Sequence, residues 1–298
     1  MDYKKLGKSN LNISRIGFGT MSLKPDQPDF SRMIDTAIDQ GINYFDTADL
    51  YDKGENEALL GKVFKGKRSK VIIATKVGNQ WREDGSGWDW NPRKDYILKC
   101  ADESLRRLQT DYLDLYQLHG GTMEDNIEES IEAFEILIQQ GKILNYGLSS
   151  IRPNVIREHI KHGNMVSVMT QYSLLDKRPE ESTLDLLFEN NIGVVTRGSV
   201  ASGLLINKTA KEYLGYSESE VKNVKDLLDR MSDEHKKASH IAIQYVLNHP
   251  AVTSAIIGIR TPEQLEDAIK AVNLPPLSEE EMNLLHKSVA AKLYTEHR

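Results

Sequence analysis

Four side chains in the first 120 residues are of the types that move protons to and from oxygen atoms. They are a carboxylate, a phenol, an ammonium group and an imidazole: Asp46, Tyr51, Lys76 and His119. A lysine beside a phenol favours the phenolate form, and a neighbouring carboxylate keeps that lysine charged and oriented. An imidazole alongside can donate a hydrogen bond that polarises a carbonyl oxygen. Together the four types predict acid–base chemistry at a carbonyl group.

These four residues include no obvious nucleophile, and they form neither a metal cluster nor a redox centre. A hydride or an electron must therefore come from a cofactor. Each residue also has an ordinary structural explanation, because Asp46 can cap a helix, Lys76 can lie at a rim and His119 can pack near a core. Their joint placement is what decides between the two interpretations.

The elements that must position these residues are short apolar runs rich in β-branched residues, separated by stretches with helical periodicity. Eight such runs start at Arg15, Ile42, Lys70, Tyr112, Ile143, Val166, Ile192 and Thr253. Strand and helix repeated eight times in about 250 residues favour a closed (β/α)8 TIM barrel of the α/β class over an open doubly wound sheet. We expect residues 1–298 to form one such domain.

Two additions flank the predicted barrel. The stretch YKKLGKSNLNIS holds a turn between two short alternating segments, which predicts an N-terminal β-hairpin that plugs one end. Ser278 and Glu281 form a capping-box pattern that opens an extra C-terminal helix. Two connections are long, Val77 to Pro92 and Gly198 to roughly Glu234, and long loops are often functional or partly disordered.

The carboxyl ends of the strands in such a barrel form the face where active sites lie. The polar residues that close the apolar runs are Asp46, Lys76, His119, Ser149 with Ser150, Gln171, Arg197 and Arg260. All of them are expected to converge on that single face. This convergence favours the catalytic interpretation.

Six segments in this order resemble the signature of the aldo-keto reductases: DTADLYDKGENE, IATKVG, SLRRLQTDYLDLYQLHG, GLSS, QYSLLD and IGIRTPEQLEDA. The match runs from about Tyr3 to the C-terminal helix. The resemblance implies an NADP(H)-dependent carbonyl reductase with Tyr51 as general acid/base. It also implies that Lys76 and Asp46 tune Tyr51 and that His119 orients the carbonyl group.

The resemblance further implies a set of positions for NADPH, although no GxGxxG segment follows any predicted strand. Ser149, Ser150 and Gln171 match the positions that hold the nicotinamide carboxamide. The remaining cofactor positions are Gly19, Thr20, Met21, Arg197, Gly198, Ser199, Val200, Gly203, Leu204, Gly258, Arg260, Thr261, Gln264 and Asp267. A helix N-terminus next to Arg260 suits the 2′-phosphate that distinguishes NADP(H) from NAD(H).

Three of these positions depart from the usual family pattern. Ser150 and Ala268 stand where asparagine is expected, and Arg197 stands where an aromatic ring usually stacks on the nicotinamide. A guanidinium plane can also stack, but its charge repels the oxidised ring more than the reduced one. We hypothesise that Arg197 favours binding of the reduced cofactor. The alternative is that Arg197 turns outward and pairs with a carboxylate.

All three tryptophans lie in the first long connection, at Trp81, Trp88 and Trp90. They either pack on the barrel rim or form an aromatic substrate wall, for which Trp81 and Trp88 are the candidates. The second long connection is polar and charged, so we expect no rigid closed lid from it.

The composition limits the partners. The formal charge of −6 without a basic cluster excludes nucleic acid and anionic membranes as expected partners, and the one cysteine, Cys100, fits core packing in a reducing cytoplasm. We expect a small carbonyl compound as substrate, no bound metal, and a monomer or small homo-oligomer. Two rivals remain: an aldolase that forms a Schiff base on Lys76, and a non-catalytic NADPH-sensing subunit.

Overall fold

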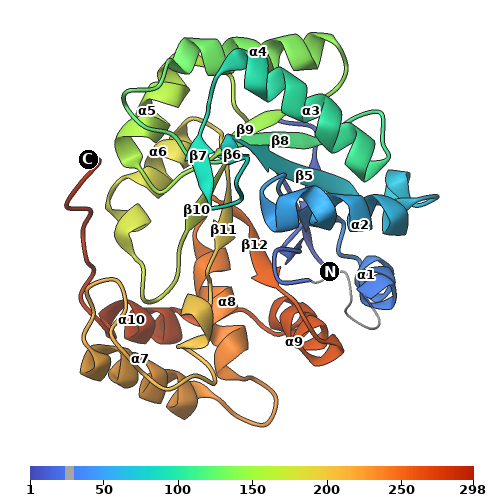
Figure 1. Cartoon of the computed structure of the whole chain (residues 1–298). Coiled ribbons are helices and arrows are strands. Elements are labelled where there is room, and N and C mark those ends of the chain that lie inside the picture. The colour runs from blue at the N-terminus through green and yellow to red at the C-terminus, as the bar shows by residue number, and fades with distance from the viewer. Residues whose placement is uncertain (24–29) are drawn as a thin grey trace.

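A closed barrel of eight parallel strands forms the centre of the computed structural model, which describes residues 1–23 and 30–298 (Figure 1). Around the barrel the strand order is β10-β11-β12-β3-β4-β5-β8-β9. The strands are β3 Ile16–Gly19, β4 Tyr44–Asp46, β5 Ile72–Val77, β8 Leu115–Leu118, β9 Tyr146–Ser149, β10 Ser167–Gln171, β11 Gly193–Arg197 and β12 Val252–Gly258. Seven lie within the predicted runs and β12 begins one residue before its run, so the predicted barrel is confirmed.

The register of the strands explains which side chains point into the barrel. Ala74 pairs with Asp46 and packs in the cluster of apolar side chains shared with the N-terminal hairpin. Side chains alternate along a strand, so Lys76 points to the same side as Ala74. Lys76 in turn pairs with Gln117 on β8, two residues before His119. The pleat therefore directs these polar groups toward one place.

The helices that connect the strands surround the barrel (Figure 1). They are α1 Phe30–Asp39, α2 Glu55–Phe64, α3 Lys94–Leu108, α4 Ile127–Gln139, α5 Pro153–His162, α6 Thr183–Glu189, α8 Ala238–Asn248 and α9 Pro262–Asn273. Their apolar sides pack on the strands in one large cluster, which includes Cys100. Burial raises the pKa of the Cys100 thiol to about 12, so this cysteine serves packing, as predicted.

The N-terminal hairpin is present as predicted, with β1 Tyr3–Lys5 antiparallel to β2 Asn12–Ser14. Its side chains Leu6, Leu11 and Ile13 are buried in the cluster inside the barrel. Gly7 has φ of +53°, and a Cβ there would lie 2.4 Å from the carbonyl oxygen of Val166 at the start of β10. The hairpin therefore closes the amino-terminal end of the barrel and leaves the opposite end for ligands.

Both long connections contain regular structure, so treating them as plain loops was wrong. The first folds into a hairpin of β6 Asn79–Trp81 and β7 Trp88–Trp90. The second contains α7 Glu218–Met231, whose N-cap Ser217 forms a capping box with Glu220. The sequence held both signals, namely the Asp84-Gly85 turn and the Ser-x-x-Glu spacing followed by apolar residues at helical intervals.

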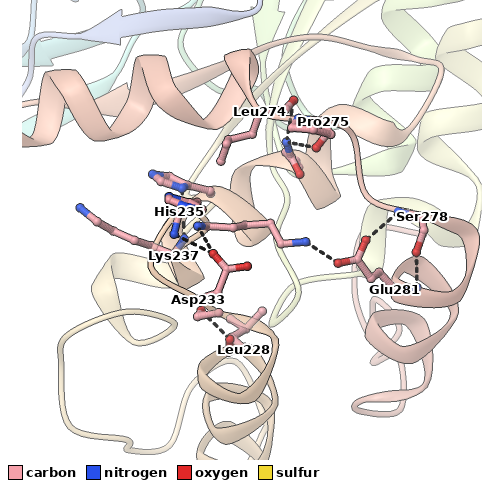
Figure 2. A network of polar contacts seen from close by, with 12 residues as sticks. Leu228, Asp233, His235, Lys237, Leu274, Pro275, Ser278 and Glu281 are labelled. Atoms are coloured by element: carbon pink, nitrogen blue, oxygen red, sulfur yellow. Dashed lines mark hydrogen bonds and ion pairs between the residues drawn. The ribbon is translucent and has the colours of Figure 1, made fainter.

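The C-terminal helix α10 Glu279–Lys287 begins with the predicted capping box of Ser278 and Glu281. Figure 2 shows how it is tied to the segment between α7 and α8: Asp233 accepts hydrogen bonds from the backbone of that turn, and Lys236 forms an ion pair with Glu281. Within the described residues, no helix combines the length and the apolar character that crossing a bilayer requires.

Candidate active site

A buried ion pair lies at the carboxyl-terminal end of the barrel. Lys76 Nζ donates to Asp46 Oδ1 at 2.6 Å, to the Thr47 carbonyl oxygen at 2.7 Å and to the Tyr51 hydroxyl at 3.4 Å. Lys76 is 1% exposed and Asp46 is 4% exposed. Burial acts to lower the pKa of Lys76, but Asp46 and Tyr51 outweigh it and hold that pKa above its ordinary value. The ammonium group is therefore charged and uses all three of its N–H donors.

Tyr51 reaches this ion pair because the chain turns back sharply after it. Tyr51 begins a short 3-10 helix in which Asp52 and Lys53 have φ of 47° and 54°, and Gly54 continues with φ of 89°. Left-handed conformations at two residues other than glycine are costly, so the surrounding contacts must hold them. The turn keeps the phenol over the barrel mouth, within reach of Lys76.

Two buried residues at the start of α2 hold this turn, and the sequence analysis identified neither of them. Asn56 Oδ1 accepts hydrogen bonds from the hydroxyls of Thr20 and Thr47, at 2.7 Å each. Glu57 accepts from Thr75 at 2.6 Å and from Arg107 at 2.7 Å. Thr47 and Thr75 neighbour Asp46 and Lys76, so these bonds fix the Tyr51 turn to both strands. The spacing of Asn56 and Glu57 on one helix face with Leu60 was the sequence signal that they are buried.

His119 directly follows β8, and its ring is roughly perpendicular to that of Tyr51, with 6.1 Å between ring centroids and an interplanar angle of 80°. Burial and the charges of Lys76 and Arg197 lower the pKa of His119 to about 3. The imidazole is thus neutral near pH 7 and carries one N–H, which is enough to donate to a carbonyl oxygen. The structure brings all four predicted catalytic side chains together.

The predicted nicotinamide residues lie across the barrel mouth, at the ends of β9, β10 and β11. Gln171 Oε1 accepts from Arg197 Nη1 at 2.8 Å, while Gln171 Nε2 donates to the hydroxyl of Tyr213 at 3.2 Å. Ser149 is half-buried, and the Ser150 hydroxyl accepts the backbone N–H of Arg152 at 3.1 Å. The contact made by Arg197 is with an amide rather than a carboxylate, and the sequence analysis did not identify Tyr213 as a partner of Gln171.

The other cofactor candidates divide by exposure. Five of them are buried: Gly19, Thr20, Ser199, Gly203 and Leu204. The Thr20 hydroxyl lies within hydrogen-bond distance of the Asp46 carbonyl oxygen and of Asn56 Oδ1. Thr20 is fully buried, so it presents no surface to a ligand. Gly198 and Val200 are partly exposed, and Met21 is 65% exposed. The exposed members are the ones that can contact a ligand directly in this arrangement.

The start of α9 provides an exposed helix N-terminus, as predicted. The Thr261 side chain caps α9 by accepting from the backbone of Gln264, whose own Oε1 accepts the Arg260 N–H at 2.8 Å. Arg260 and Thr261 border a cavity of about 670 Å³ between α1 and α9, and Gly258 is exposed nearby on the chain. Such a helix end with an adjacent arginine fits an anionic group.

Asp267, further along α9, is held by α8. Its carboxylate accepts from Lys237 at 2.8 Å, from Ser239 and from His240 at 3.0 Å. His240 Nδ1 accepts the Lys237 backbone N–H, so its Nε2 carries the proton. Although burial acts to raise the pKa of Asp267, these contacts hold it well below its ordinary value. Whether Asp267 also contacts adenine stays a prediction.

The tryptophans of the β6–β7 hairpin have different surroundings. Trp90 packs on the rim, because a Cβ on Gly78, which has φ of +125°, would lie 2.5 Å from its ring. Trp81 is half-buried and donates to the Leu50 carbonyl oxygen at 3.2 Å, next to Tyr51. Trp88, its partner across the hairpin, is 48% exposed. The role of Trp81 and Trp88 as a substrate wall stays a prediction.

Fold and site together define a (β/α)8 barrel with Asp46, Tyr51, Lys76 and His119 gathered at its carboxyl-terminal face, and comparisons with known proteins give its family. The sequence model of the Aldo/keto reductase family matches residues 15–290. The uncharacterized oxidoreductase YqkF of Bacillus subtilis (strain 168) is 47% identical over 307 residues, across the full length of both chains. The holo form of aldo-keto reductase AKR11C1 from Bacillus halodurans is 46% identical with a TM-score of 0.94, over 100% of this chain and 99% of that chain.

The chain belongs to the aldo/keto reductase family. This is a family of oxidoreductases whose chemistry is consistent with carbonyl reduction, and its members generally bind a nicotinamide cofactor. A more distant relative is the NADH-specific methylglyoxal reductase of Escherichia coli (strain K12), 26% identical over 96% of this chain and 98% of its own length. The dinucleotide preference therefore has to be argued from this chain's own residues.

Proposed function

We propose that this chain is an NADPH-dependent reductase of small aldehydes and ketones, with Tyr51 as the proton donor. The observation that carries the proposal is the set of contacts at one buried lysine. Lys76 binds the Asp46 carboxylate and lies 3.4 Å from the Tyr51 hydroxyl. The ammonium group is placed to stabilise the negative charge that develops on the phenol oxygen during proton transfer.

In the proposed reaction, Tyr51 transfers its proton to the carbonyl oxygen of the substrate. Lys76 stabilises the resulting phenolate, and Asp46 keeps Lys76 charged while the barrel excludes water from the pair. His119, held neutral by its low pKa of about 3, donates a hydrogen bond to the same carbonyl oxygen and orients it. The phenol then recovers its proton from solvent at the open barrel mouth.

A reduced nicotinamide supplies the hydride in this proposal when it is bound. The residues present fit that group, because Gln171 offers both an amide donor and an amide acceptor to a carboxamide, and Ser149 ends the neighbouring strand β9. Arg260 and the N-terminus of α9 are the proposed site of the 2′-phosphate, beside the cavity between α1 and α9. This positive environment supports NADPH over NADH.

Of the two rivals, the aldolase alternative conflicts with the geometry of Lys76. A Schiff base requires a neutral amine with a free lone pair, whereas Lys76 is held charged by Asp46 and donates three hydrogen bonds. Borohydride treatment in the presence of a carbonyl substrate tests this point, and we expect no covalent adduct on Lys76 by mass analysis. The sensing-subunit rival predicts tightly retained cofactor with slow turnover instead.

The experiment that tests the proposed function follows NADPH oxidation by absorbance with a panel of aldehydes and quinones, in parallel with NADH. We expect turnover with NADPH and weaker use of NADH. A wild-type protein inert toward the whole panel would contradict the proposal. A single domain over residues 1–298, a cytoplasmic location and a monomeric or small homo-oligomeric state stay predictions from the sequence.

A further inference from the structure

The side-chain amide of Gln171 is held from both sides by residues of other elements. Arg197, at the end of β11, donates to Gln171 Oε1 at 2.8 Å, and Gln171 Nε2 donates to the Tyr213 hydroxyl at 3.2 Å. An amide has two acceptor lone pairs on its oxygen and two N–H donors on its nitrogen. One acceptor site and one N–H of Gln171 therefore remain for a ligand.

The two partners also fix which way the amide faces. A guanidinium group only donates hydrogen bonds, so Arg197 must meet the oxygen of Gln171 and never its NH₂ group. The nitrogen then faces Tyr213, whose hydroxyl accepts. If Arg197 moves onto a bound nicotinamide ring, Gln171 loses its contact with Arg197 and keeps its hydrogen bond to Tyr213.

Tyr213 is carried by a tight turn that limits its movement. Tyr213 and Tyr216 exchange backbone hydrogen bonds of 3.0 and 2.9 Å around Leu214 and Gly215, which have φ of 49° and 82°. Positive φ at both central residues is the geometry of a two-residue hairpin turn. Tyr216 is buried, and its hydroxyl donates to the Ala290 carbonyl oxygen at 3.0 Å. The turn is thereby anchored to the segment after α10.

We infer that Tyr213 is a positioning residue that orients the Gln171 amide for recognition of the nicotinamide carboxamide. This inference rests on the proposed function and adds to it a residue from outside the barrel strands. The remaining N–H and lone pair of Gln171 complement the oxygen and the NH₂ group of a primary carboxamide. The orientation of the carboxamide in turn fixes which face of the nicotinamide ring meets the substrate.

Tyr213 and Arg197 are expected to affect cofactor binding in different ways. Oxidised and reduced cofactors carry the same carboxamide, so loss of the Tyr213 hydroxyl weakens the binding of both by the same factor. A charged Arg197 against the ring instead discriminates between the two redox states. A nucleotide without a nicotinamide depends on neither residue in this way.

The test compares Tyr213→Phe with the control variant Tyr3→Phe. Tyr3 lies on the N-terminal hairpin, and its exposed hydroxyl donates to the Gly41 carbonyl oxygen at 2.9 Å. Dissociation constants are measured by calorimetry for NADPH, NADP+ and adenosine 2′,5′-bisphosphate. For Tyr213→Phe we expect both dinucleotides to bind about three- to tenfold more weakly, the range of one hydrogen bond, with no change for the bisphosphate. The Tyr3→Phe control is expected to bind all three like the wild type.

Unchanged dinucleotide affinity in Tyr213→Phe would overturn the inference and leave the proposed function intact. Equal weakening of the bisphosphate would also overturn it, because that result indicates a general structural role for Tyr213. A second readout uses the acetylpyridine analogue of NADP+, which lacks the carboxamide NH₂ group. The wild-type preference for NADP+ over this analogue must shrink in Tyr213→Phe. A wild type that binds no dinucleotide would instead contradict the proposed function itself.

Discussion

The two halves of the barrel mouth differ in how firmly their polar side chains are held. On the half formed by β4, β5 and β8, Asp46 and Lys76 are almost completely buried and bound to each other. On the half formed by β10, β11 and β12, Arg197 and Arg260 are exposed. A buried charge that loses its partner costs far more than an exposed one, so the first half tolerates little change. Two of the three expected departures from the family pattern, Arg197 and Ala268, belong to β11 and to the helix after β12.

The largest expected effect comes from removing the hydroxyl of Tyr51, the proposed proton donor, on the buried half. Tyr51→Phe keeps the ring and deletes the hydroxyl that lies 3.4 Å from Lys76 Nζ. We expect kcat for carbonyl reduction to fall by about 10²–10⁴-fold, the usual contribution of a positioned general acid. NADPH affinity, measured by fluorescence titration, should stay within about twofold of the wild type. The reason is that the Tyr51 hydroxyl is not one of the groups proposed to form a hydrogen bond with the cofactor. An unimpaired variant would contradict the assignment of Tyr51 as donor.

The second prediction concerns stability rather than rate. Lys76→Met leaves the Asp46 carboxylate buried without its cation, which typically costs about 3–5 kcal/mol in the free energy of unfolding. Denaturant unfolding of the variant measures this loss. The matched control is the double variant Asp46→Asn with Lys76→Met, which has no charge to strand.

We expect the double variant to recover a substantial part of the stability lost in Lys76→Met, since the two residues act as a coupled pair. Both variants should be inactive in carbonyl reduction. If the single and double variants are equally destabilised, the ion pair contributes through packing alone, and the contrast between the two halves of the mouth is weaker than the burial indicates.

The buried half was largely predictable from the sequence because it depends on strand register. Alternation along β5 and β8 places the residues that close each run on one side of the sheet, so Lys76 and His119 were found from their positions. The supports of this half were less visible. Glu57 contacts Thr75 and Arg107, residues far from it in the sequence, and its spacing on one helix face with Leu60 was the local signal of its burial.

The exposed half depends more on tertiary contacts and was predicted less completely. Tyr213 belongs to the long connection after β11, and its contact with Gln171 spans 42 residues of sequence. Helix α7 had a local signal in its capping box, and the β6–β7 hairpin had one in its turn. Both signals lay inside polar segments that resembled loops. The buried position of Thr20 likewise follows from Asn56 and Asp46, which meet it only in the folded chain.

The third prediction tests whether the exposed half sets the redox preference. Arg197→Tyr restores the aromatic ring expected at this position and removes a positive charge. One unit charge about 4 Å from another in water contributes about 1 kcal/mol, so we expect the affinity ratio of NADPH to NADP+ to fall by about fivefold. Titration of both cofactors measures the ratio. The effect should weaken at high salt, because exposed charges are screened.

An unchanged ratio in Arg197→Tyr would mean that the guanidinium stays with Gln171 when the cofactor binds. Arg197→Lys serves as the matched control, because it keeps the charge without the planar group. If the lysine variant keeps the wild-type ratio, charge is the cause of the preference. If it behaves like the tyrosine variant, planar stacking is the cause.

The smallest expected effect concerns Asp267 on α9, the helix that follows β12. Its contacts with Lys237, Ser239 and His240 lower its folded pKa below the unfolded value. The stabilisation is therefore complete above the unfolded pKa of about 3.9 and is lost as the pH falls through the folded pKa. Because the site is partly exposed, we expect Asp267→Asn to cost only about 1 kcal/mol at pH 7, or about 2–4 °C in Tm.

Thermal unfolding of the wild type and Asp267→Asn at several pH values checks the sign of this effect. The difference in Tm between them should be largest near neutral pH and should shrink as the pH falls below about 4. Ser239→Ala, which removes one neutral donor to the same carboxylate, should retain most of the pH dependence. A difference that grows on acidification would mean that these contacts do not stabilise Asp267 as an anion.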